Sequence, residues 1–173
     1  IGHSKSPLIH NHWIKKYGLD GSYEGIDIAP EDLTDRLPAL FEAGYAGFNV
    51  TIPHKEAVLA LCQELTDVAV KVGAVNTLYK DEGRIFGTNT DVFGFMENVN
   101  TAIRHFGFSH TLQNGPAVIL GAGGAARAAL YGLLEEGVPE IFIANRSFEK
   151  AQTLAEMNPA IVKPIEWDRR SEI

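Results

Sequence analysis

The chain has 173 residues, 45% of them hydrophobic, and a formal net charge of −7. This length supports one or two modest domains. The acidic balance argues against a nucleic-acid partner, and no apolar run is long enough to cross a bilayer. The single cysteine, Cys62, cannot form an internal disulfide, and no Cys/His cluster has metal-site spacing. We interpret Cys62 as a small buried hydrophobe, and we expect a cytoplasmic protein without a metal.

The first half of the chain predicts alternating helices and strands. Ser6 and Pro7 are typical of a helix start, and Ile9, Trp13 and Tyr17 predict a helix that stops at Gly18. The further elements expected, in chain order, are a strand at 22–29, a helix at 31–43 that Pro38 should break or kink, a strand at 47–51, helices at 53–62 and 66–72, a hairpin of 75–79 and 84–87, and a helix at 91–106. The polar stretch 109–115 is expected to be a link.

A glycine-rich turn lies between an apolar run at 117–120 and a helix-forming run at 125–134. Gly121 is expected to form a tight turn, Gly123 to let backbone approach a pyrophosphate, and Ala126 to allow close helix–strand packing. The start of the helix would favour an anion. The pattern predicts a dinucleotide site, although a glycine turn without a ligand remains an alternative.

The next apolar strand, at 141–144, ends in Asn145, Arg146 and Ser147, with Lys150 nearby. A dinucleotide fold presents its ribose-binding residue at about this distance from the glycine turn. An acidic residue there would favour NAD, whereas a cation suits the 2′-phosphate of NADP. We therefore predict NADP, and the alternative is that Arg146 is an ordinary surface residue.

Small polar residues gather at strand ends and helix starts in the first half. Ser4 and Ser6 suit a carboxylate, but a simple helix cap explains Ser6 equally well. Lys55 in the first turn of the expected helix would oppose the helix dipole, which makes either a functional role or a solvated surface position plausible. Asp91 alone would be interpreted as an N-cap. Spacing does not establish that these segments converge.

Together, these motifs resemble the shikimate dehydrogenase family over essentially the whole chain. The segments that carry the resemblance are 3–7 (HSKSP), 49–55 (NVTIPHK), 73–78 (GAVNTL), 89–91 (NTD), 121–125 (GAGGA) and 145–147 (NRS). The resemblance implies reversible reduction of 3-dehydroshikimate to shikimate with NADPH, a step of aromatic amino-acid synthesis.

The resemblance also implies a role for each residue of the site. Ser4 and Ser6 would hold the substrate carboxylate, and Lys55 and Asp91 would form the catalytic pair. The residues expected to contact the ring hydroxyls are Thr51, Lys55, Asn76 and Asp91. The residues expected to bind NADP are Gly121, Ala122, Gly123, Gly124, Ala125, Asn145, Arg146, Ser147 and Lys150.

The fold class implied is α/β, with a substrate-binding domain at 1–90 and a Rossmann-type doubly wound NADP-binding domain at 91–173. The small-molecule substrate and NADP are the expected ligands, and the expected assembly is a monomer or a homodimer. The family continues beyond the residues present and includes a strand before them, so we expect the chain to be truncated at both ends.

Three alternatives remain open. The first is a quinate/shikimate dehydrogenase of broader substrate range. Many members of the family have glycine at the position of Val92, whereas some relatives that also accept quinate share a bulkier residue there. Glutamyl-tRNA reductase is a second, but its chemistry needs a thioester-forming cysteine and Cys62 lies in an apolar segment. The third is a non-catalytic dinucleotide-binding module.

Overall fold

The computed structural model describes residues 1–107 and 111–173. The chain forms two compact units, Ile1–Leu40 and Phe41–Ile173. The expected link at 109–115 lies partly outside the described residues, and within it η3 (Leu112–Asn114) is a single 3-10 turn.

The first unit contains α1 (Ser6–Lys16), η1 (Pro30–Asp32) and most of α2 (Leu33–Glu42). The predicted helix α1 is confirmed, and Gly18 beyond its end has a φ of +63°. The helix begins at Ser6 with Lys5 as its N-cap, so Ser6 is not the cap itself. Pro38 lies inside α2 without ending it, so of the two outcomes predicted, a break or a kink, the break is absent. A proline removes one hydrogen bond, and tertiary context often overrides local preference.

The strand predicted at 22–29 is wrong, because these residues form no sheet ladder. The side chain of Asn11 instead forms hydrogen bonds with both backbone polar groups of Tyr23. Its Nδ2 donates to the Tyr23 carbonyl at 2.7 Å, and its Oδ1 accepts from the Tyr23 N–H at 2.9 Å. The Tyr23 ring also stacks on His10 at 4.3 Å between centroids. A side chain of α1, twelve residues away in the chain, therefore satisfies the backbone of Tyr23 in place of a neighbouring strand.

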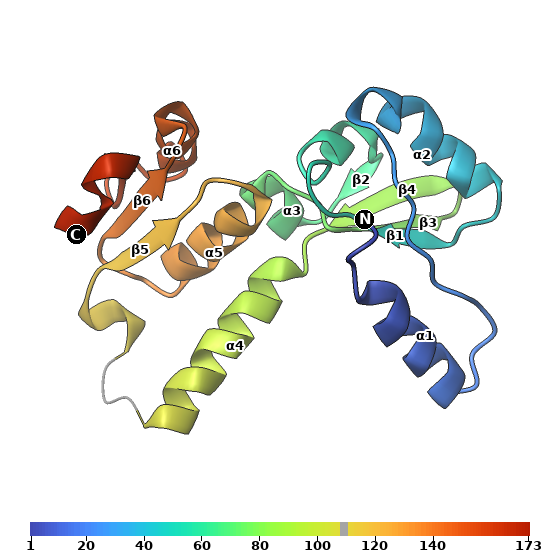
Figure 1. Cartoon of the computed structure of the whole chain (residues 1–173), viewed down its shortest axis with the longest axis horizontal. Coiled ribbons are helices and arrows are strands. Elements are labelled where there is room, and N and C mark those ends of the chain that lie inside the picture. The colour runs from blue at the N-terminus through green and yellow to red at the C-terminus, as the bar shows by residue number, and fades with distance from the viewer. Residues whose placement is uncertain (108–110) are drawn as a thin grey trace. The chain divides into compact units, whose positions relative to one another are not determined.

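In the second unit, the first sheet has the strand order β1-β3-β4-β2 (Figure 1). Its strands are β1 (Gly47–Asn49), β2 (Glu64–Leu65), β3 (Thr77–Asp81) and β4 (Arg84–Thr88). The predicted hairpin is confirmed, and its turn residues Glu82 and Gly83 both have positive φ, as a tight hairpin turn requires. The two-residue strand β2, which is parallel to β4, was not predicted because it is too short to show a period.

The helix predicted at 53–62 is only partly present. The chain forms turns and then a 3-10 segment, η2 (Ala57–Leu61). The helix predicted at 66–72 is confirmed as α3 (Asp67–Val72), with the Thr66 side chain as N-cap and left-handed Gly73 as C-cap.

The second sheet is parallel, in the order β5-β6-β7. The elements run β5 (Ala117–Leu120), α5 (Gly124–Glu135), β6 (Ile141–Asn145), α6 (Phe148–Ala155), β7 (Val162–Glu166) and η4 (Trp167–Glu172). The strands and helices share one apolar core that includes Leu130, Ile143 and Leu154. These repeated strand–helix–strand units confirm the predicted α/β class.

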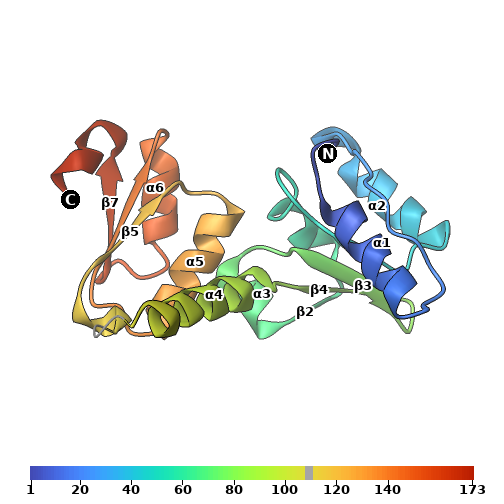
Figure 2. The same ribbon diagram turned by 60° about the horizontal axis from the view of Figure 1, so that its bottom comes forward.

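Helix α4 (Asp91–Phe106), also as predicted, follows β4 and lies beside α5 (Figures 1 and 2). A Cβ atom on Gly132 of α5 would come within 2.6 Å of Met96 Cγ, so the two helices approach closely through this glycine. Val72, Ala74 and Ala128 form a second buried cluster between α3 and α5. Buried apolar contacts therefore join the elements of the two sheets within this unit.

Gly87 in β4 packs where three side chains converge, and we expect Gly87→Ala to destabilise the protein. An added Cβ would lie 2.6 Å from Cys62 Sγ, 2.9 Å from Leu65 Cδ2 and 3.0 Å from Val75 Cγ2. Overpacking of this kind costs about 1–3 kcal/mol. Urea unfolding, followed by circular dichroism, measures the loss in free energy of unfolding.

Gly94→Ala in α4 is the matched control, because no atom lies within 4 Å of the position of its added Cβ. It should stabilise the helix by roughly 0.5–1 kcal/mol through backbone propensity alone. Equal effects of the two substitutions would contradict the close packing around Gly87.

Candidate active site

The residues after β4 position the first turn of α4. Buried Asn89 donates from Nδ2 to the Ala74 carbonyl at 2.9 Å, and its Oδ1 accepts the Asp91 backbone N–H at 2.9 Å. Asp91 is the first helical residue and Thr90 is the N-cap, so the Asp91 side chain is not the cap. Because Asn89 satisfies the backbone, the Asp91 carboxylate is available for other partners.

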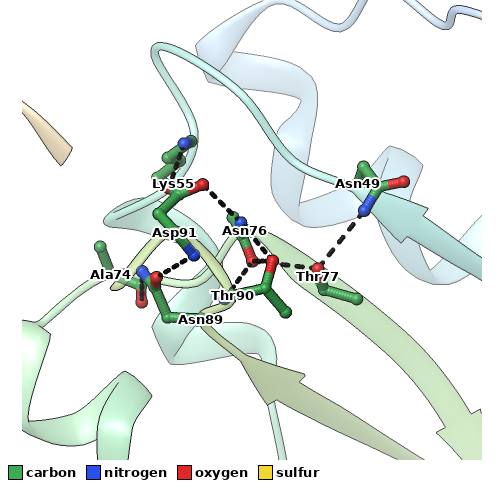
Figure 3. A network of polar contacts seen from close by, with 8 residues as sticks. All are labelled: Asn49, Lys55, Ala74, Asn76, Thr77, Asn89, Thr90 and Asp91. Atoms are coloured by element: carbon green, nitrogen blue, oxygen red, sulfur yellow. Dashed lines mark hydrogen bonds and ion pairs between the residues drawn. The ribbon is translucent and has the colours of Figure 1, made fainter. Parts of the chain in front are cut away.

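Lys55, Asn76 and Asp91 meet at the ends of three separate segments (Figure 3). Lys55 Nζ donates to Asp91 Oδ2 at 2.6 Å, and Asn76 Nδ2 donates to Asp91 Oδ1 at 2.7 Å. The Lys55 side chain is 15% exposed and that of Asp91 is 30% exposed. Both oxygens of the Asp91 carboxylate therefore have a hydrogen-bond donor. The Lys55 ammonium is held in a position that is partly shielded from solvent.

Asn76 is itself fixed by further contacts in the same network. It is buried, its Nδ2 also donates to Thr90 Oγ1 at 2.9 Å, and its Oδ1 accepts the Thr90 backbone N–H at 3.0 Å. The Thr77 hydroxyl donates to Asn76 Oδ1 at 3.0 Å and accepts a hydrogen bond from Asn49 Nδ2 at 3.3 Å. Asn49, Thr77, Asn89 and Thr90 were not predicted as site residues, although all four lie in the motifs that suggested the site.

Lys55 lies in a turn and not in the first turn of an α-helix, so the predicted opposition between its charge and a helix dipole is absent. Its carbonyl accepts the Val75 N–H at 2.8 Å, which ties this segment to the Asn76 segment. Thr51 is exposed in the preceding turn, where its carbonyl accepts the His54 N–H at 2.9 Å. The turn brings Lys55 to the site while Thr51 remains open to solvent.

Ser4 and Ser6 belong to the first unit, whereas Thr51, Lys55, Asn76 and Asp91 belong to the second. The Ser6 N–H donates to Ser4 Oγ at 3.3 Å, so the two serines are neighbours at the start of α1. Burial raises the pKa of Tyr23, and a hydrogen bond with the Ser6 side chain acts in the opposite direction. The described contacts unite Lys55, Asn76 and Asp91 in one group, and the serines in another.

The glycine turn has the geometry expected of it. Gly121 has a φ of +118°, and its N–H donates to the Ala144 carbonyl at 2.8 Å. Gly123 is the N-cap of α5, and a Cβ on either glycine would meet no atom within 4 Å. Ala126 packs against the core, as its small size predicted. This open backbone, which precedes a helix of 12 residues, can accept a phosphate group.

Gly124 connects the glycine turn to the lysine. An added Cβ there would lie 3.2 Å from Lys55 Cδ and 3.4 Å from Lys55 Cβ. The stem of Lys55 therefore lies against the first turn of α5. The sequence assigned Gly124 only to cofactor binding and did not reveal this contact.

Arg146 directly follows β6 and Lys150 lies in α6; both are exposed, and within 1–107 and 111–173 neither forms an ion pair. Asn145 Nδ2 donates to the Ser147 carbonyl at 2.8 Å, and Ser147 Oγ donates to Glu149 Oε2 at 2.9 Å. The pKa of Glu149 lies below its usual value because its carboxylate accepts hydrogen bonds from its own backbone N–H and from Ser147. The Glu149 carboxylate is thus hydrogen-bonded locally, and the charged groups of Arg146 and Lys150 are accessible to solvent.

The surroundings of Cys62 do not favour nucleophilic catalysis. Cys62 is half-buried, its Sγ donates to the Val58 carbonyl at 3.3 Å, and burial raises the pKa of its thiol. A thiol held in this way is a poor nucleophile. Within the described ranges, no three His, Cys, Asp or Glu side chains group as a metal site. Among the same residues, no helix combines the length and apolar character needed to span a membrane.

Two family descriptions match the chain. "Shikimate dehydrogenase substrate binding domain" matches residues 1–78, and "Shikimate / quinate 5-dehydrogenase" matches residues 101–168. Among curated proteins, shikimate dehydrogenase (NADP(+)) of Paramagnetospirillum magneticum is 44% identical over 99% of this chain and 61% of its own length. That of Cereibacter sphaeroides is 45% identical over 100% of this chain and 61% of its own length. The chain thus spans about three-fifths of the length of these relatives.

Solved structures agree with both matches. Shikimate dehydrogenase from Aquifex aeolicus superposes with a TM-score of 0.85 at 34% identity, covering 99% of this chain and 62% of that one. The enzyme from Thermus thermophilus, in complex with NADP(H) and shikimate, has a TM-score of 0.78 at 41% identity, covering 94% and 59%. The agreement of motifs, fold and relatives shows that the chain belongs to the shikimate dehydrogenase family.

Proposed function

We propose that the protein catalyses the reversible NADPH-dependent reduction of 3-dehydroshikimate to shikimate. The observation that carries this proposal is that Lys55 and Asn76 both donate to the carboxylate of Asp91, at the start of α4. The relatives named as NADP-dependent shikimate dehydrogenases support it. We also propose that residues 1–90 bind substrate and 91–173 bind the dinucleotide, since the two sheets fall on either side of Asp91.

In this proposal, Lys55 donates the proton in the reduction and accepts it in the reverse reaction. When bound, NADPH supplies the hydride to the ketone carbon. Negative charge then develops on the ketone oxygen, and the Lys55 ammonium stabilises that charge and donates the proton that completes the alcohol. Asp91 holds the ammonium in place, and the reverse reaction returns the proton to Lys55.

The remaining residues orient the two ligands. Ser4 and Ser6 would bind the substrate carboxylate through their hydroxyls, and the ring hydroxyls would be bound by Thr51, Lys55, Asn76 and Asp91. The residues that would hold NADP are the predicted set: Gly121, Ala122, Gly123, Gly124, Ala125, Asn145, Arg146, Ser147 and Lys150. The open backbone at Gly121 and Gly123 fits a pyrophosphate. Arg146 and Lys150 are exposed, form no ion pair with another described residue, and fit a 2′-phosphate. A cytoplasmic location and a monomeric or homodimeric state remain predictions from the sequence.

A quinate-accepting enzyme is the second candidate. A quinate dehydrogenase from Corynebacterium glutamicum, in complex with NAD, is 31% identical with a TM-score of 0.81. Val92 packs against the buried cluster of Val72, Ala74 and Ala128, so its extra bulk is part of the core beside Asp91. The activity test therefore compares shikimate with quinate as substrates.

The direct test measures initial rates of nicotinamide absorbance change in the full-length protein, with shikimate or quinate and with NADP or NAD. We expect the highest kcat/KM for shikimate with NADP. Turnover with quinate and NAD at an equal rate would favour the second candidate. Absence of turnover with every pair would leave a dinucleotide-binding module, which would still bind NADP in a titration.

Lys55→Met tests the proton-transfer role, because methionine retains an unbranched stem against Gly124 but has no ammonium. We expect kcat to fall by roughly 10²–10⁴-fold, the range for loss of a general acid. The Kd for NADP, measured by fluorescence titration, should change less than twofold. Lys80→Met is the control, since Lys80 pairs with Glu42 at 2.7 Å outside the site, and an equal kcat loss there would refute a special role for Lys55.

Arg146→Asp tests the cofactor assignment. The substitution replaces a cation with an anion that would repel a 2′-phosphate and accept from a 2′-hydroxyl. Hydrogen bonds to charged groups contribute about 1.5–3 kcal/mol, so kcat/KM for NADP should fall roughly ten- to hundredfold while that for NAD rises. Arg146→Lys keeps the charge and should retain most of the NADP preference. Unchanged cofactor selectivity in Arg146→Asp would place the 2′-phosphate contact elsewhere.

A further inference from the structure

Arg127 lies one turn beyond Gly124 in α5 and contacts the segment that carries Lys55. Its Nη2 is 3.4 Å from Glu56 Oε2, with the arginine side chain 20% exposed and that of the glutamate 52% exposed. Its Nη1 lies 3.5 Å from the position of an added Cβ on Gly73, the residue that ends α3. Within the described ranges, its Nε is buried without a hydrogen-bond partner.

Glu56 directly follows Lys55, so the two contacts with α5 act on adjacent residues. The Lys55 stem lies against Gly124, and the Glu56 carboxylate meets Arg127 on the same helix face, three residues later. The Lys55 carbonyl is also held by the Val75 N–H at 2.8 Å. This segment is therefore fixed to α5 by two side chains and to the Asn76 segment by its backbone.

Stability alone does not account for Arg127. A half-exposed ion pair contributes little free energy, and a buried donor without a partner costs about 1–3 kcal/mol. An apolar side chain could pack beside Gly73 without that cost. The Arg127 guanidinium instead fixes the position of Glu56, and the backbone then restrains the adjacent Lys55.

We propose that Arg127 is a positioning residue that, through Glu56, holds Lys55 in register with Asp91 and with the first turn of α5. The inference rests on the proposed function, in which that turn binds the cofactor and Lys55 supplies the proton. The same helix would then set the position of both reactants. Misplacement of a reacting group by about 1 Å can reduce the rate by about 10²-fold, so such a link affects turnover more than affinity.

The test compares Arg127→Met, Arg127→Lys and Glu56→Gln with the unaltered full-length protein. Methionine keeps an unbranched stem but removes the charge, and we expect kcat to fall on the order of tenfold or more. The KM for shikimate and the Kd for NADP should change less than twofold. Lysine should restore most of kcat, and Glu56→Gln should reproduce the loss, with no further loss when it is combined with Arg127→Met.

Arg104→Met is the matched control, because Arg104 pairs with Glu97 at 3.2 Å on the exposed surface of α4. Its kcat should equal that of the unaltered protein. Arg127→Met with an unaltered kcat would overturn the inference, as would a kcat loss matched by equal losses in NADP affinity and melting temperature. If the unaltered protein binds NADP but does not turn over shikimate, the proposed function fails first and this inference fails with it.

Discussion

The buried side chain of Asn76 is the constraint on which the candidate site depends. Its amide binds Thr90 and Asp91, its backbone N–H donates to the Thr88 carbonyl at 3.0 Å, and its carbonyl accepts the Val50 N–H at 2.7 Å. A buried amide is costly unless its donors and acceptors are satisfied. The satisfied geometry holds together the end of β1, the end of β4 and the start of α4. Through Asp91 it also fixes the lysine ammonium (Figure 3).

The first turn of α5 links this network to the glycine-rich turn. Absence of a side chain at Gly124 admits the stem of Lys55, while open backbone at Gly121 and Gly123 leaves room for a phosphate. One short stretch thus combines a surface for a catalytic side chain with a surface for an anion. The buried cluster between α3 and α5 keeps that stretch close to the first sheet of this unit. Packing at a distance from the chemistry consequently determines which groups meet.

Local patterns predicted the elements whose hydrogen bonds are local. The hairpin of β3 and β4 has alternating residues around a turn, and α4 has a helical period, so both were predicted correctly. The predictions failed where a hydrogen bond to a residue outside the segment determines its secondary structure. The segment at 22–29 bonds to Asn11 instead of a strand, and the segment around Lys55 gives its carbonyl to Val75 instead of a helical N–H. Neither partner is visible from the period of the segment itself.

The amino-acid sequence alone was enough to identify the kinds of groups available: a glycine turn after a buried strand, a cation after the next strand, and lysine, asparagine and aspartate at element ends. Those residue types, in that order, were enough to indicate the family and the reaction class. The folded chain was needed to show that Lys55 and Asn76 both bind Asp91, and that Gly124 and Arg127 contact the segment of Lys55 and Glu56. The physical reason is that such meetings depend on strand register and helix packing between segments far apart in the chain, which no local periodicity encodes.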